Sequence, residues 1–250
     1  MKLFAYGCSY TFGSELADHL TINSSVVRTE KLKRKLGHDK FYGQYGFADK
    51  EKENAFAYPA SIAKALGMND YENRAYPGHG TLNIFYKLLQ DLQNHLISKD
   101  DIIFVGLTSF NRYSWFKDTG KHEVGLPTSG NWPSEDFKKQ IILHTSNNDW
   151  LLNNIAFTKA IQEICRDYKF FYQTTHWPYT HTYGAAEVEP SIFKELEKID
   201  ENALLPFRGI YYETPNPNKW HRYSHTFGHP FQQYHESFGK KLGEAILEKI

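Results

Sequence analysis

The chain has 250 residues, no net formal charge, 40% hydrophobic residues and 16% aromatic residues. This length suits one large domain, and a neutral chain has no general attraction to nucleic acid or to anionic membranes, so neither is expected as a partner. Two cysteines cannot form a disulfide scaffold, the amino end has no apolar signal segment, and no stretch is long enough to cross a bilayer, so the sequence predicts a cytoplasmic protein.

The first predicted strand, 2–6, leads into a turn with a glycine at each end, from Gly7 to Gly13. Ser9 lies in this turn directly after the strand, where a parallel sheet presents side chains to a ligand. The glycines permit a tight turn and a close approach of the backbone to another group. An ordinary strand-to-helix turn capped by Ser or Thr is the alternative interpretation. Residues from about 21 to 55 are irregular and form a predicted insertion with a basic cluster.

The rest of the chain alternates between predicted helices and strands. Helical patterns cover 58–67, 81–96, 151–164, 191–201 and about 231 to the end, and strand patterns cover 71–75, 101–107 and 169–174. In the second of these helices the apolar side chains share one face: Leu82, Phe85, Leu88, Leu89, Leu92 and Leu96. Residues 113–148 are irregular and form a second predicted insertion. The alternation predicts one α/β domain over 1–250, a three-layer α/β/α sandwich with a parallel, flavodoxin-like sheet of about five strands.

Polar loops follow three of the predicted strands. They contain Ser9, Gly78 and the segment from Thr108 to Arg112. In folds of this kind the ligand site lies beyond the carboxyl ends of the strands, so we expect these loops to converge at one edge of the sheet. His229, just before the last predicted helix, is expected at the same edge.

Short blocks of a distinctive composition are spread over nearly the whole chain: Gly7-Cys8-Ser9-Tyr10-Thr11, Tyr58-Pro59, Asn73-Arg74-Ala75-Tyr76-Pro77-Gly78, Thr108-Ser109-Phe110-Asn111-Arg112 and Gly228-His229-Pro230. In this order they resemble the SGNH (GDSL-like) hydrolase family, and more closely a phage and bacterial branch that begins Gly-Cys-Ser-Phe/Tyr-Thr. The resemblance implies a serine hydrolase of the esterase or deacetylase type, acting on an acyl ester of a small molecule or carbohydrate. An acyltransferase using the same site is a further possibility, because the two reactions differ only in what attacks the acyl intermediate.

The resemblance also implies roles for individual residues. Ser9 would be the nucleophile and His229 its general base. The oxyanion hole would combine the backbone N–H groups of Ser9 and Gly78 with a side-chain donor, for which Asn111, Thr108 and Ser109 are candidates and Asn111 is chemically nearest. The residues expected to contact the substrate are Tyr10, Arg112, His176 and Trp177. No cofactor is expected, and the sequence leaves the oligomeric state open.

The chain departs from the family pattern at two catalytic positions. Thr226 stands where the family's Asp-x-x-His block has its aspartate, so either a Ser–His dyad operates or catalysis is lost and the fold serves as a binding or scaffold protein. The third-block Gly-x-Asn-Asp is also missing. His221, His225 and His229 recur every four residues, but Pro230 argues against a helix there, and no metal is predicted. His235 is interpreted as a solvent-facing or satisfied residue of the last helix.

Overall fold

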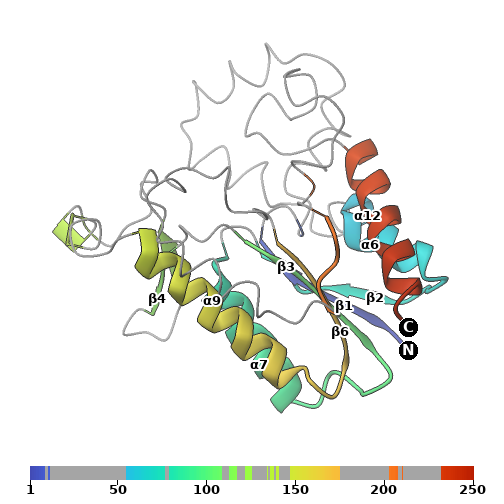
Figure 1. The fold of residues 1–250 in the computed structure, drawn as a ribbon, viewed down its shortest axis with the longest axis horizontal. Coiled ribbons are helices and arrows are strands. Elements are labelled where there is room, and N and C mark those ends of the chain that lie inside the picture. Colours follow the sequence, from blue (N-terminus) through green and yellow to red (C-terminus); the bar gives the residue numbers. More distant parts are fainter. Residues whose placement is uncertain are drawn as a thin grey trace, which may run out of the picture.

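A computed structural model gives the architecture of the chain (Figure 1). It describes residues 1–8, 11, 55–76, 79–108, 113–116, 122–125, 134, 136–137, 139–140, 147–174, 203–207, 210 and 232–250. The centre of this part is a parallel sheet of four strands in the order β2-β1-β3-β6. Their bounds are Leu3–Gly7 for β1, Tyr71–Asn73 for β2, Ile102–Leu107 for β3 and Lys169–Thr174 for β6.

Strands β1, β3 and β6 end within one residue of the same level of the sheet, and β2 ends two positions earlier, opposite Ala5. Gly7 of β1 pairs with Gly106 of β3, and Gly106 pairs in turn with Gln173 of β6. Leu204 adds a parallel bridge to Tyr172 on the outer side of β6. The order of the strands is that of a flavodoxin-like sheet, which confirms the predicted α/β fold.

Helices cover both faces of the sheet (Figure 1). On one face lie α6, Tyr58–Ala65, and α12, Gln232–Leu247; on the other lie α7, Thr81–Gln93, and α9, Asn147–Ile164. Because successive side chains of a strand point to opposite faces, β3 supplies both cores. Ile102 and Phe104 belong to the core under α6 and α12, whereas Ile103 belongs to the core under α7 and α9.

Helix α12 packs closely against α6 because two glycines of α12, Gly239 and Gly243, face α6. A Cβ atom at Gly239 would lie 2.4 Å from the Tyr58 carbonyl oxygen, and one at Gly243 would lie 2.5 Å from the Ala65 Cβ. The earlier glycine of α12 thus lies at the start of α6 and the later one at its end, so the two helices run in the same direction. Ile246, near the end of α12, shares a core with residues at the start of β1, so α12 begins at the carboxyl ends of the strands.

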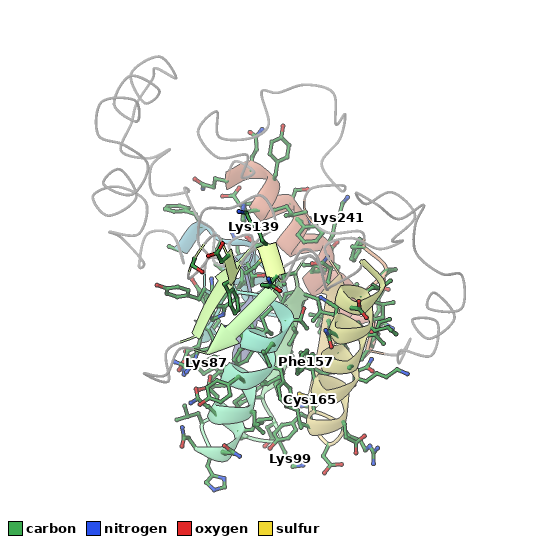
Figure 2. The ribbon with its side chains drawn as sticks, turned by 90° about the vertical axis from the view of Figure 1, so that its left-hand side faces the viewer. Lys87, Lys99, Lys139, Phe157, Cys165 and Lys241 are labelled. Carbon is green, nitrogen blue, oxygen red and sulfur yellow. The ribbon has the colours of Figure 1, made fainter. Side chains whose placement is uncertain are left out.

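The opposite layer is built by α7 and α9, whose rings of Phe85 and Phe157 lie 5.8 Å apart. Figure 2 shows these two helices side by side, with Phe157 and Cys165 labelled along the α9 segment. At its amino end α7 is joined to α9 by a hydrogen bond of 2.8 Å from Asn154 Nδ2 to Thr81 Oγ1. Cys165 is buried just after α9, and burial raises the pKa of its thiol to about 12, so this thiol stays protonated.

Two expectations about local structure need correction. Residues 113–148, predicted to be irregular, contain an antiparallel pair of strands, β4 (Tyr113–Phe116) and β5 (His122–Gly125). The helix predicted over 81–96 ends at Gln93, so Leu96 is 50% exposed instead of buried. The chain turns out of the helix at His95, whose φ of 54° is left-handed. The helix predicted at 191–201 and most of the 21–55 insertion lie outside the described residues.

Candidate functional site

The carboxyl ends of β1, β2 and β3 lie together at one end of the sheet, called here the carboxyl edge. Gly7, the last residue of β1, pairs in register with Gly106, the last residue but one of β3. After β2, the chain continues alongside β1: the Arg74 N–H donates to the Ala5 carbonyl at 2.7 Å and the Tyr76 N–H to the Gly7 carbonyl at 3.2 Å. The segment before the Gly78 loop is therefore held beside the segment before Ser9.

One of the predicted site residues is described. Thr108 is 5% exposed, and its hydroxyl oxygen has no hydrogen-bond partner among the described residues. It follows Gly106 by two positions, as Ser9 follows Gly7, the register partner of Gly106. The other predicted site residues lie outside the described part: Ser9, Tyr10, Gly78, Ser109, Asn111, Arg112, His176, Trp177 and His229.

Two glycines near the carboxyl ends of β1 and β3, Gly7 and Gly106, leave room for hydroxyl groups. Thr11 Oγ1 and Tyr58 Oη are 2.6 Å apart, both buried, in a hydrogen bond that either can donate. A Cβ atom at Gly7 would lie 2.0 Å from Thr11 Oγ1. At Gly106 it would lie 2.5 Å from Thr11 Oγ1 and 2.5 Å from Tyr58 Oη. Both positions therefore require glycine because the Thr11 side chain lies directly on them.

The same turn is held from the side of β2. Asn73, the last residue of β2, donates its side-chain amide to the Thr11 carbonyl at 2.9 Å. Its Oδ1 accepts the N–H of Ala75 at 3.2 Å, which fixes the orientation of the amide. Asn73 is 5% exposed, so these hydrogen bonds are made without competition from water.

Tyr58 also connects the turn to α12. Its backbone N–H, at the start of α6, donates to His235 Nδ1 at 3.2 Å, and the two rings stack with centroids 5.8 Å apart. His235 is fully buried. Burial raises the pKa of the Tyr58 phenol, while its hydrogen bond to Thr11 lowers it by less, so the hydroxyl is neutral at physiological pH. His235 supplies the acceptor that the first turn of α6 lacks, since Ala57 provides no side-chain cap.

A second buried polar cluster lies on the other face of the sheet, around Asp91 of α7. Arg74 binds this carboxylate through two nitrogens, at 2.8 and 2.7 Å, and the Tyr6 hydroxyl donates to it at 2.8 Å. Lys87 adds a bond of 3.1 Å. Burial by itself raises the pKa of Asp91, but the hydrogen bonds from Arg74, Tyr6 and Lys87 outweigh it and leave the pKa below its usual value. The cluster joins β1 and the segment after β2 to α7.

The sequence pointed to the blocks that contain these residues without showing what the residues do. Thr11, Tyr58 and Asn73 all lie in blocks named for the family resemblance, and three residues separate Gly7 from Thr11. Their shared feature is a buried hydrogen-bonding group at the carboxyl edge.

Within the described residues, no three His, Cys, Asp or Glu side chains are grouped as a metal ion requires. None of the described helices has the length and apolar character needed to cross a membrane.

No protein-family model matches the sequence, and no curated protein matches it. Three solved structures align with nearly the whole chain. A protein of Desulfitobacterium hafniense DCB-2 assigned to the lipolytic G-D-S-L family is 12% identical, with a TM-score of 0.49 and 98% of each chain covered. A carbohydrate esterase is 14% identical, with a TM-score of 0.47 and 99% of this chain and 65% of that chain covered. LAE5, an α/β hydrolase from the metagenome of Lake Arreo, Spain, is 11% identical, with a TM-score of 0.49 and 100% and 96% covered.

Proposed function

We propose that this chain is a serine hydrolase that cleaves an acyl ester of a small molecule or carbohydrate at the carboxyl edge. The carrying observation is that Gly7, Gly106 and the segment ending at Tyr76 lie together there. The blocks that resemble SGNH hydrolases continue directly from these residues. Helix α12 begins at the same edge, and His229 precedes its first residue by three positions.

In the proposed reaction, the Ser9 hydroxyl oxygen attacks the ester carbonyl carbon while His229 accepts the hydroxyl proton. The tetrahedral intermediate collapses when the alcohol leaves with that proton. Water then attacks the acyl-serine, again giving a proton to His229, and the acid is released as Ser9 recovers its hydrogen. The substrate would be contacted by Tyr10, Arg112, His176 and Trp177.

The oxyanion formed in both steps needs hydrogen-bond donors that are already in position. The backbone N–H groups of Ser9 and Gly78 are two proposed donors. For the side-chain donor we favour Thr108 over Asn111, because the Thr108 hydroxyl is buried at the carboxyl edge and has no partner among the described residues to satisfy it. Loss of such a donor lowers kcat by on the order of 10²-fold. Thr108→Val, which removes the hydroxyl, is therefore expected to lower kcat by that factor, whereas Thr108→Ser is expected to retain most of the rate.

The test uses a fluorophosphonate probe, in which a serine oxygen bonds to phosphorus as fluoride leaves. Wild-type protein is expected to be labelled, Ser9→Ala to remain unlabelled, and His229→Ala to react far more slowly. Hydrolysis of p-nitrophenyl acetate should follow the same order. Absence of labelling in folded wild-type protein would reject the hydrolase and favour a binding protein with the same fold, the alternative that Thr226 raises by replacing the family's aspartate.

A further inference from the structure

We propose that four buried residues, Thr11, Tyr58, Asn73 and His235, position the Ser9 turn relative to the start of α12. This group is called here the Tyr58 bridge. The inference rests on the proposed function, because it assigns the bridge the task of setting the distance between Ser9 and His229. The four are positioning residues, which act through the backbone segments that they hold.

The bridge forms a continuous path between the two segments. From the start of α12, His235 Nδ1 accepts the Tyr58 N–H at 3.2 Å. From the other end of the Tyr58 side chain, its hydroxyl meets that of Thr11 at 2.6 Å. Asn73 holds the Thr11 carbonyl at 2.9 Å. Each link is a hydrogen bond between groups that water does not reach.

The ends of this path adjoin the proposed catalytic pair in the chain. Thr11 is two residues after Ser9, and His235 is six residues after His229. The Tyr58 ring is fixed along its length, since it stacks on His235 and meets Phe104 and Phe238 edge-on at 5.9 and 5.3 Å. Because close packing on several sides leaves the ring little freedom to rotate, the Tyr58 hydroxyl is held at a fixed position relative to the Tyr58 backbone and His235.

Fixed geometry of this kind matters because displacement of a catalytic group by about 1 Å can cost about 100-fold in rate. Tyr58→Phe keeps the ring and its aromatic contacts but removes the hydrogen bond to Thr11. We expect it to lower kcat and the rate constant of fluorophosphonate labelling by about 10- to 100-fold, with KM changed little. A residue with a merely structural role would lower the melting temperature without this selective loss of kcat.

Tyr6→Phe is the matched control. Tyr6 is as deeply buried as Tyr58, and its hydroxyl also makes one strong hydrogen bond, 2.8 Å to Asp91, on the opposite face of the sheet. We expect this variant to lose stability and to retain a labelling rate within about twofold of wild type, because the bond that it removes joins Tyr6 to Asp91 of α7 and involves none of the four bridge residues.

Thr11→Val removes the same bond from the other side and serves if Tyr58→Phe does not fold. Its effect on labelling should equal that of Tyr58→Phe, the double variant should be no worse than either, and Thr11→Ser should restore the rate. Single effects that multiply in the double variant, or wild-type labelling in Tyr58→Phe, would overturn the inference while leaving the hydrolase intact. Wild-type protein that resists the probe would overturn the proposed function, and the inference with it.

Discussion

Replacing Gly106 with alanine inserts a methyl group against the two hydroxyls that join α6 to the turn after β1. The new carbon would lie 2.5 Å from both Thr11 Oγ1 and Tyr58 Oη, well inside the 3.4 Å at which ordinary contact begins. Overpacking a filled site costs about 1–3 kcal/mol, and separation of the two hydroxyls adds about 1 kcal/mol. We expect a loss of about 2–4 kcal/mol, which for a chain of this size lowers Tm by roughly 5–15 °C.

The loss is measured by urea and thermal unfolding of wild type and Gly106→Ala, each also in a Tyr58→Phe background. Because Tyr58→Phe removes one of the two clashing oxygens, the alanine should cost less there than in wild type. Gly67→Ala is a control: Gly67 has a φ of 68° but open space around it, so about 1–2 kcal/mol of backbone strain is expected, with no effect on probe labelling. A cost for Gly106→Ala below about 1 kcal/mol, or equal in both backgrounds, would refute the steric reasoning.

Three further predictions concern stability. Arg74→Gln removes two hydrogen bonds to the buried Asp91 carboxylate and should cost about 2–4 kcal/mol in urea unfolding, against less than about 1 kcal/mol for Lys87→Gln; equal losses would contradict this account. Since the pKa of Asp91 is lower in the folded than in the unfolded chain, its contribution is complete above the unfolded value of about 3.9 and is lost as pH falls through the folded value. Between about pH 5 and about pH 2, the free energy of unfolding should therefore fall more for wild type than for Asp91→Asn. Parallel plots of this free energy against pH for the two proteins would contradict the prediction. Gly239→Ala directs a Cβ at the Tyr58 carbonyl, 2.4 Å away, and should cost about 1–3 kcal/mol; an unchanged urea midpoint would show that α12 shifts freely.

The architecture was predictable wherever one pattern decided it. The nearly continuous apolar run of 102–107 is typical of a strand buried on both faces, and it lies at the centre of the sheet. A helix over 58–67 is favoured by Pro59 near its start and Gly67 near its end, and α6 begins at Tyr58; Gly67 lies just beyond α6 with a positive φ. The hairpin of β4 and β5 was not predicted, because each strand is four residues long and pairing across it depends on a partner outside the local sequence.

The candidate site was predictable at the level of blocks and not at the level of contacts. The sequence placed polar loops after three strands, but it did not show that Thr11 lies on Gly7 and Gly106, because that contact depends on how two strands and a helix meet. His235 left a signal that could have been used. It lies on the same face as Phe238 and Leu242, three and seven residues later, and this spacing predicts the buried position that it occupies.

Consecutive residues at the end of β1 are held from opposite faces of the sheet. Tyr6 is bound to Asp91 under α7, and Gly7 lies beneath Thr11, which Tyr58 holds under α6. Burying so many polar groups is unfavourable unless each finds a partner, and partners that are found restrict the groups to one arrangement. Of these contacts, the one between Thr11 and Tyr58 is the one that we propose directs Ser9, two positions before Thr11, whereas the Tyr6–Asp91 bond stabilises β1 against α7. For a nucleophile that must meet a base supplied from another part of the chain, such preorganisation is where buried polar contacts are most useful.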